Sequence, residues 1–430
     1  MEKLFLGIIK HYYWILVAIA ASIMFGFRDT SSAFIVVVVI ATVICAQNIK
    51  FEQLDFFVVL YIIYNLITGI VGSLPDRLFY LGVRSEIIPI CFYFIARSEQ
   101  FKNEDFFLNM RRPLLFAMAC GLFFYFVQPS FYVQFKVNDL WSTMNIDATE
   151  ISGYLLYEVS RLSSFWPHSY FMGYASLFIF ILTTKRIIVD NAFSKLDSIS
   201  MIVSFFCLFF AQQRVSIAFA ILYLVLLTIY AAIHRLKNRK YLYALWFFSI
   251  VFGIAIAAIA VIVLGDGFVT YIVNRSVNYD GNMVGDRFAM FSQFMDRLST
   301  FGDGLGRYGH GAVYEGFKGI PDCDYMRIPC EIGFVGLFML LYFCTSSIVK
   351  GLFIFRYCLF EICCLVFVLI AMLGAAPWEL GVLHPFLYWF CIGHIQSKFL
   401  RRDELEEEYE AYIQKENPQE ESEEQEEDEK

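Results

Sequence analysis

Long apolar runs separated by short polar segments are the dominant pattern of this sequence. Runs near 20 residues recur along almost all of the 430-residue chain. That length suits a helix that crosses the roughly 30 Å hydrocarbon layer of a bilayer. The runs are continuous and do not alternate between polar and apolar positions, which excludes a membrane β-barrel. The pattern predicts an all-α membrane protein with twelve spans, near residues 12–27, 32–47, 54–72, 79–96, 113–128, 170–184, 197–212, 214–233, 243–264, 331–349, 358–374 and 382–397.

Lysine and arginine are unevenly divided between the loops that twelve spans create. With the N-terminus in the cytoplasm, the inner segments hold 19 of these residues and the short outer segments hold 6. Because basic loops favour the cytoplasmic side, both termini are predicted to be cytoplasmic. Arg84 and Glu86 interrupt the span near 79–96, the weakest of the twelve, but without it basic loops would lie on both sides. Two outer segments, about 128–169 and 265–330, are too long for turns, and long loops often carry function.

The composition separates a membrane body from an acidic tail. Hydrophobic residues make up 59% of the chain and charged residues only 17%, against about a quarter in ordinary soluble proteins. Residues 403–430 carry a charge of −13 within a net charge of −8, so the preceding residues, 1–402, carry +5. The tail is expected to form a short amphipathic helix and then to be disordered. The apolar positions of that helix are Leu405, Tyr409, Tyr412 and Ile413.

Eleven cysteines are present, and nine of them lie in or beside apolar spans, where they are interpreted as small buried side chains. Cys323 and Cys330 lie in the second long loop and could be either disulfide-bonded or free. The sequence has no CxxC pair and no zinc-like spacing. We therefore expect no metal and no other cofactor.

The loop near 265–330 is rich in basic residues although it is predicted to lie outside. Arginine guanidinium groups suit phosphate and pyrophosphate oxygens, so an anionic partner is one interpretation. The other is pairing with acidic residues of the same region, which include Asp324 and Glu331. Arg214 opens an apolar span after Gln212 and Gln213, so it should face a polar cavity, a partner or the outer interface. The basic residues of the loop are Arg275, Arg287, Arg297, Arg307, Lys318 and Arg327.

Glycines, carboxylates and histidines add candidates for a site. The sequence Phe301-Gly-Asp-Gly-Leu-Gly-Arg-Tyr-Gly309 allows sharp turns or close approach to a ligand, but it lacks the lysine and the context of a nucleotide site. Asp322 and Asp324 precede the next span, where a carboxylate could act as a general base toward a hydroxyl. The candidate acid/base histidines are His168 and His310.

Four local motifs resemble those of the O-antigen polymerase and O-antigen ligase superfamily of bacterial inner-membrane proteins. They are Gln-Gln-Arg214-Val-Ser-Ile-Ala, Gly285-Asp-Arg287 followed by Phe291, Gly302 to Gly306, and Asp322-Cys-Asp-Tyr-Met-Arg-Ile-Pro-Cys-Glu-Ile-Gly-Phe-Val-Gly336. Pro167-His168 is a fainter match. The topology covers most of the chain and the motifs cover about 180–340. Ligases of the family typically carry a histidine where this chain has Asp322, which favours a polymerase.

The resemblance implies a C-type membrane glycosyltransferase-like fold and an undecaprenyl-pyrophosphate-linked oligosaccharide donor, with a chain-length regulator as a further partner and no nucleic acid. Arg214 and Arg287 would bind the pyrophosphate, and Asp322 or Asp324 would act on the acceptor hydroxyl. The remaining substrate-binding candidates are Arg307, Arg327, His168, Glu331, Gly304 and Gly306.

Three alternatives stay open beside a metal-independent polysaccharide polymerase. A ligase would move finished glycan to lipid A core or protein. A transporter or flippase of lipid-linked sugars would be expected to show internal repeats and charges at mid-membrane, whereas here the charges are predicted in an outer loop. A membrane acyltransferase would be expected to carry a histidine deep in an early span, and only His11 is near one.

Overall fold

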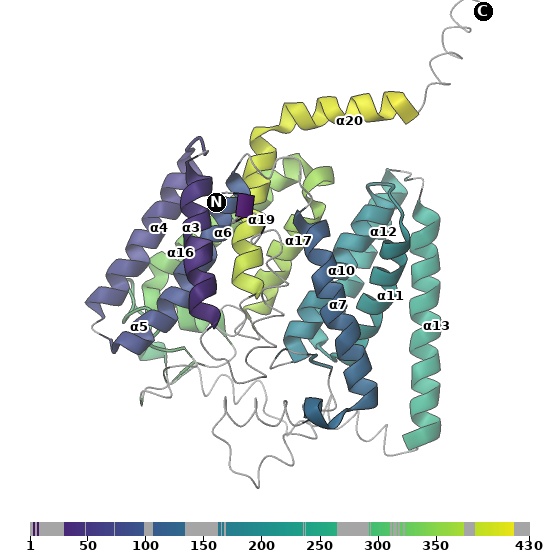
Figure 1. Cartoon of the computed structure of the whole chain (residues 1–430), viewed down its shortest axis with the longest axis horizontal. Helices are drawn as coiled ribbons and strands as arrows, with labels where there is room; N and C mark the ends of the chain where they lie inside the picture. Colours follow the sequence, from purple (N-terminus) through teal and green to yellow (C-terminus); the bar gives the residue numbers. More distant parts are fainter. Residues whose placement is uncertain are drawn as a thin grey trace, which may run out of the picture.

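The computed structural model describes residues 3, 4, 7, 30–47, 49–72, 74–98, 106–133, 162–164, 166, 169–234, 236, 238–264, 292, 294–309, 312, 316, 319–320, 323–373 and 383–416. Within these residues all regular secondary structure is helical. Figure 1 shows a bundle of roughly antiparallel helices with one helix, α20, lying across one end. The predicted span near 12–27 lies outside the described residues.

The first group of helices contains the weakest predicted span. It consists of α3 (Thr30–Ala46), α4 (Gln53–Val71) and a continuous stretch made of α5 (Asp76–Gly82), the π-helix η1 (Val83–Ile87), the 3₁₀-helix η2 (Ile88–Ile90) and α6 (Cys91–Arg97). Arg84 and Glu86 lie in η1, and Pro89, which has no N–H to donate, lies in η2. The interruption seen in the sequence is therefore a local change of helix geometry. Such π segments are frequent at functional sites.

The middle group is built around one central helix. It contains α7 (Phe106–Val127), α10 (Ser169–Ile188), α11 (Lys195–Phe210), α12 (Arg214–Ile233) and α13 (Arg239–Leu264). In α10, 89% of the most apolar window is buried, because α7, α11, α12 and α13 pack around it. Tyr174 of α10 also contacts Phe367, which joins the middle group to the last helices.

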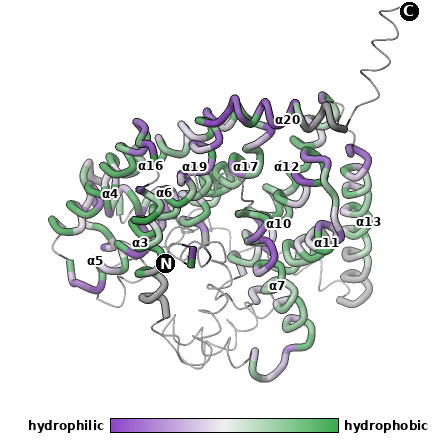
Figure 2. Tube along the Cα trace, turned by 45° about the horizontal axis from the view of Figure 1, so that its top comes forward, coloured by the Kyte–Doolittle hydropathy of each residue, from purple (hydrophilic) through white to green (hydrophobic). Residues whose placement is uncertain are grey.

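The last group contains α16 (Asp324–Phe353), α17 (Phe355–Ala371), α19 (Leu383–Leu400) and α20 (Arg402–Glu416). The backbone of α16 leaves helical geometry at Gly333, where φ is 73°. α20 occupies the place where a short amphipathic helix was predicted. It is the most hydrophilic helix in Figure 2, whereas the bundle helices are mostly hydrophobic.

The outward faces of several helices are apolar, as expected for contact with lipid. On α4, Phe56 is 65% exposed and Ile70 is 69% exposed, while Asp55 and Asn65 of the same helix are fully buried. Soluble proteins rarely expose such continuous apolar surface. Six helical stretches among the described residues are long and apolar enough to span a membrane: α4, Asp76–Arg97, α7, α10, α12 and α16. The chain is thus a helical membrane protein; the count of twelve spans and their sidedness stay predictions.

The two ends of the bundle differ. The short connections near residues 50, 190, 236, 354 and 400 lie at the end that α20 covers, called the α20 end, together with the end of α6 and the start of α7 (Figure 1). There Arg97 of α6 bonds Asp55 of α4 at 2.8 Å, and Asp197 of α11 accepts from Arg111 of α7 and from Arg186 of α10. Basic residues of the loops that were predicted to be cytoplasmic, such as Arg97 and Lys185, lie at this end. The opposite end carries the starts of α10, α12 and α16.

Candidate functional site

A glycine-rich segment is clamped to the break in α16. The backbone N–H of Asp303 donates to the carbonyl of Cys330 at 2.8 Å, and that of Gly304 donates to Glu331 at 3.0 Å. Beyond the break, the N–H of Phe334 donates to Ser299 at 3.0 Å. A helix break frees backbone donors and acceptors that must find new partners when buried. The segment 299–304 supplies those partners.

Glycine is required at several points of this segment. Gly304 and Gly306 have φ values of 128° and 87°, which L side chains rarely adopt. A Cβ on Gly306 would lie 2.4 Å from the carbonyl oxygen of Leu78. On Gly302 it would lie 2.2 Å from the carbonyl oxygen of Glu331. The segment is therefore wedged between α5 and α16, and these glycines serve packing directly.

Arg327 is the centre of a buried ionic cluster. Its Nε donates to Asp324 at 2.9 Å, its Nη1 to Glu331 at 2.5 Å and its Nη2 to Glu86 at 2.7 Å. All four side chains are at most 1% exposed. Glu331 also accepts the backbone N–H of Tyr308 at 2.9 Å. One guanidinium thus ties η1, the first turns of α16 and the glycine-rich segment together.

Arg327, Asp324 and Glu331 were predicted as residues of a substrate site, but the structure buries them. Arg327 was counted with the outer loop, yet it lies in α16 and is buried, and the alternative of pairing with Asp324 and Glu331 is the one seen. The carboxylate of Asp324 accepts a hydrogen bond from Arg327, and its backbone N–H donates to the carbonyl of Met372 at 3.2 Å. The structure leaves none of the three exposed to a substrate. The expectation that charges are confined to an outer loop is therefore wrong for this cluster.

Glu86 was not among the site residues predicted from the sequence. In the sequence, Glu86 was noted only because it interrupts the predicted span near residues 79–96. A charge inside an apolar run is itself a signal of a buried partner or of function. That signal was present at Glu86, but nothing in the sequence named Arg327 as its partner.

Arg307 and Tyr308 lie next to the cluster on the glycine-rich segment. The Tyr308 hydroxyl donates to the Asp303 carboxylate, and burial together with that neighbouring charge raises the pKa of Tyr308. Arg307 donates from Nη1 to the carbonyl of Asp303 at 3.3 Å, and its guanidinium lies 6.0 Å from the Tyr308 ring centroid. Arg307 is only partly buried, and its neighbour Gly306 packs against Leu78 of α5, at the end of the bundle opposite α20.

Arg214 is exposed at the first turn of α12, also at the opposite end. The corner before it is tight: Gln212 has a φ of 52°, and a Cβ on Gly173 of α10 would lie 2.7 Å from Gln213. Gln212 and Gln213 therefore form the turn between α11 and α12, and this turn packs against α10. The guanidinium that follows it is presented outward.

Several sequence candidates lie outside the described residues. These are Arg287, Asp322, His168, His310, Arg275 and Lys318. Cys323 and Cys330 are described; both are buried, and they are not joined in a disulfide. In the described part of the chain, no group of three or more His, Cys, Asp or Glu side chains is arranged to hold a metal ion.

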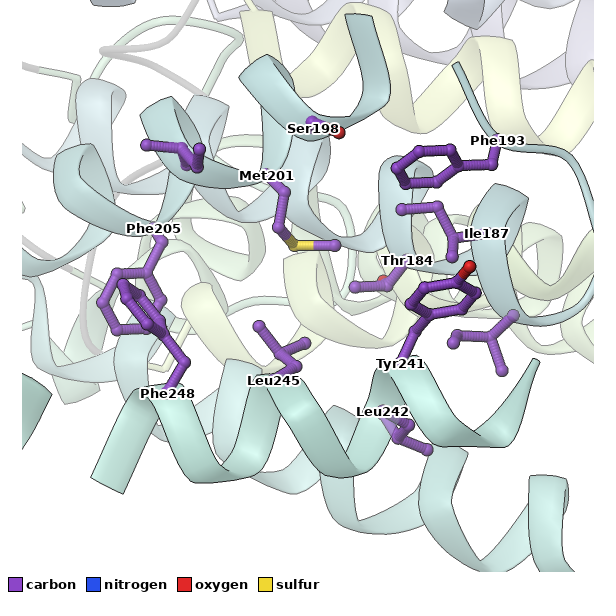
Figure 3. Close-up of a pocket in the computed structure, with 12 residues that line it drawn as sticks. Thr184, Ile187, Phe193, Ser198, Met201, Phe205, Tyr241, Leu242, Leu245 and Phe248 are labelled. Atoms are coloured by element: carbon purple, nitrogen blue, oxygen red, sulfur yellow. The ribbon is translucent and has the colours of Figure 1, made fainter. Parts of the chain in front are cut away.

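An apolar cavity of about 350 Å³ lies between α10, α11 and α13. Figure 3 shows Leu245 and Phe248 of α13 facing Met201 and Phe205 of α11 across it. Its lining hydroxyls belong to Thr184, Ser198 and Tyr241, and that of Thr184 is already bonded to carbonyls of its own helix and to Tyr223. The mostly apolar lining suits a hydrocarbon chain.

A polar cavity of about 380 Å³ lies under α20, between α7, α10, α17 and α19. Its basic residues are already paired with carboxylates: Lys185 with Asp190 at 2.9 Å, and Lys398 with Glu361 at 2.7 Å. Arg186 and Arg401 are paired with Asp197 and Glu404. The charges around this cavity are therefore largely compensated within the protein.

Comparison with known proteins adds no relative. The chain matches no protein-family model, and no curated protein matches it significantly in sequence.

Proposed function

We propose that this chain is a polysaccharide polymerase that joins undecaprenyl-pyrophosphate-linked oligosaccharide repeat units at the outer face of a bacterial inner membrane. The proposal rests on the position of Arg214, which is exposed at the first residue of the apolar helix α12, at the end of the bundle remote from α20. A cation placed there suits a lipid-linked pyrophosphate, whose charge lies at the membrane surface. Arg307, which is partly buried, is a further candidate for binding the same anion.

The buried cluster of Arg327 supports a distinction, which the sequence motifs did not make, between residues with a structural role and residues proposed to act on the substrate. Arg327 is fully engaged with three carboxylates, so we assign it to holding η1, α16 and the glycine-rich segment in place. Gly304 and Gly306 shape that segment and so position Arg307. Asp324 is fully buried and bound to Arg327, and we therefore assign the acceptor-activating role to Asp322.

The proposed reaction is one displacement at the anomeric carbon of the donor glycan. Asp322 takes the proton of an acceptor sugar hydroxyl, and the hydroxyl oxygen forms the new glycosidic bond. The bond between the anomeric carbon and the pyrophosphate oxygen breaks, and the pyrophosphate leaves on its lipid. Arg214 and Arg287 stabilise the negative charge that grows on this leaving group. Inversion at the anomeric carbon is expected.

Charge reversal at the two arginines tests this proposal. Arg214→Glu and Arg287→Glu should each abolish chain extension while single repeat units persist on surface glycan, as read from a gel of a deletion strain that carries each variant. Arg77→Glu is the matched control, because Arg77 is also exposed in a short segment of the same predicted side. Long-chain polymer at normal levels in both variants would refute the role of the arginines.

A transporter of lipid-linked sugars is the second candidate, because the buried cluster of Arg327 lies where two helices depart from regular geometry. Charged side chains inside spans and interrupted helices mark transport pathways in many membrane proteins. The same gel separates the two: a deletion strain of a polymerase keeps single-unit bands, whereas loss of all attached glycan indicates transport or ligation.

A further inference from the structure

The Arg327 cluster holds more negative than positive groups. Glu86, Asp324 and Glu331 surround one guanidinium, and each of the four is at most 1% exposed. With every carboxyl ionised the cluster would carry a charge of −2 in a region of low dielectric. Burial of even a paired charge costs several kcal/mol before any surplus is counted. A buried surplus of this kind calls for a compensating cation at one of the carboxyls.

Glu331 and Asp324 are well placed to stay ionised. One oxygen of Glu331 accepts from Arg327 and the other from the backbone N–H of Tyr308. Asp324 accepts from Arg327 and lies in the first turn of α16, where the helix dipole favours a negative charge. Both carboxylates are thus supported by donors or dipoles besides the shared guanidinium.

Glu86 is the carboxyl with the least support for a negative charge. One oxygen accepts from Arg327 at 2.7 Å, while Oε2 is buried with no hydrogen-bond partner among the described residues. The Tyr61 hydroxyl and the amide oxygen of Asn65 on α4 are likewise buried without a partner there. Glu86 and Arg327 lie within electrostatic reach of the Tyr61 hydroxyl. On this side of the cluster, Oε2 of Glu86 is thus a buried oxygen with no described donor.

We propose that Glu86 is a proton-binding site, so that the folded protein holds it as a neutral carboxylic acid. The proton sits on Oε2, where it supplies a donor to the α4 side, and the other oxygen keeps its bond to Arg327. A metal ion is the weaker occupant, since the described carboxyls are not arranged to converge on one. Glu86 would hold this proton whichever reaction the chain performs.

The surroundings of Glu86 determine what loss of the proton does. α16 contributes Asp324, Arg327 and Glu331, and α4 contributes Tyr61. Next to these, Tyr308 of the glycine-rich segment donates its backbone N–H to Glu331, and Tyr64 of α4 donates to the carbonyl of Ile332. Among these described groups Arg327 is the one cation, and it is shared with Asp324 and Glu331. Deprotonation of Glu86 therefore adds a buried negative charge that these groups do not offset, and the folded protein bears the cost of burying it.

Thermal unfolding of the full-length protein in detergent across pH, with potassium or sodium as the only added cation, tests the proposal. An unfolded Glu loses its proton near pH 4.3, so from that pH up to the pH at which folded Glu86 itself loses its proton, the folded state holds one proton more. Stability then falls as pH rises, by about tenfold in the unfolding constant per pH unit for one proton. Glu86→Gln should remain folded and lack this component, and Glu331→Asp, which keeps the neighbouring negative charge, is the matched control that retains it.

Two results would overturn the proposal. One is a Glu86→Gln protein with the same pH dependence as wild type. The other is stabilisation by sodium over potassium that Glu86→Gln removes, which would assign the site to a metal cation. If Glu86→Gln does not fold, infrared difference spectra of wild type between neutral and alkaline pH decide. A protonated-carboxyl band that is lost at alkaline pH, and is unshifted in Glu331→Asp, supports the proposal; its absence at neutral pH refutes it.

Discussion

Gly306 shows how strongly a single position can depend on the absence of a side chain. Its φ is 87°, and a Cβ would lie 2.4 Å from the backbone oxygen of Leu78, which cannot move as a flexible side chain could. We expect Gly306→Ala to destabilise the protein by about 1–3 kcal/mol. Thermal unfolding in detergent measures this. Gly253→Ala is the control, because a Cβ added there would meet nothing within 4 Å and α13 is helical at that position. Equal stability of the two variants would contradict a strained turn.

The partners of buried charges could be predicted from the sequence only when they are neighbours in it. Asp324 and Glu331 lie three and four residues from Arg327, so their pairing on one helix face was an open alternative. Glu86 is 241 positions from Arg327, and their contact depends on how η1 packs against α16. The roles of Arg287, Asp322 and His168 stay predictions, since these residues lie outside the described part of the chain.

Helix-to-helix ion pairs at the α20 end give a prediction at the scale of elements. Asp197 of α11 accepts from Arg111 of α7 and Arg186 of α10, and it is fully buried. Asp197→Asn leaves two arginines short of a counter-charge, and we expect a loss of about 3–5 kcal/mol in unfolding free energy. The Lys185–Asp190 pair is far more exposed, so Asp190→Asn should cost less than about 1 kcal/mol. Similar shifts in thermal unfolding for both variants would contradict this difference.

The apolar runs of the sequence correctly indicated the positions of the helices. In a bilayer, backbone N–H and C=O groups have no water to bond to, so an apolar run must form a helix. The ends were less predictable. α16 begins at Asp324 and α7 at Phe106, each seven residues before the predicted span. In both cases the extra turns carry charged residues, Arg327 and Arg111, that are buried in ion pairs. A hydropathy pattern assigns charged residues to loops. In the structure, the charges of Arg327 and Arg111 are neutralised by buried carboxylates inside the bundle.

The orientation of the whole molecule is testable with introduced thiols. Arg77→Cys lies at the end of the bundle remote from α20, and Glu407→Cys lies on α20 itself, and both positions are exposed. A membrane-impermeant thiol reagent added to intact spheroplasts should label the first and not the second, with the wild-type protein as background. Lysis should make both reactive. Labelling of Glu407→Cys in intact spheroplasts would reverse the predicted sidedness.

The burial of α10 has a consequence for how the protein is made. α10 is covered by α7 before it in the chain and by α11, α12, α13 and α17 after it. While synthesis proceeds, its hydroxyl-bearing positions, such as Ser176 and Thr183, enter the bilayer before most of their eventual neighbours exist. Thr184 and Ser176 meet this by bonding carbonyls of their own helix. These two hydroxyls therefore need no partner from another helix when α10 enters the bilayer, whereas α11, α12, α13 and α17 pack around α10 after they have been synthesised.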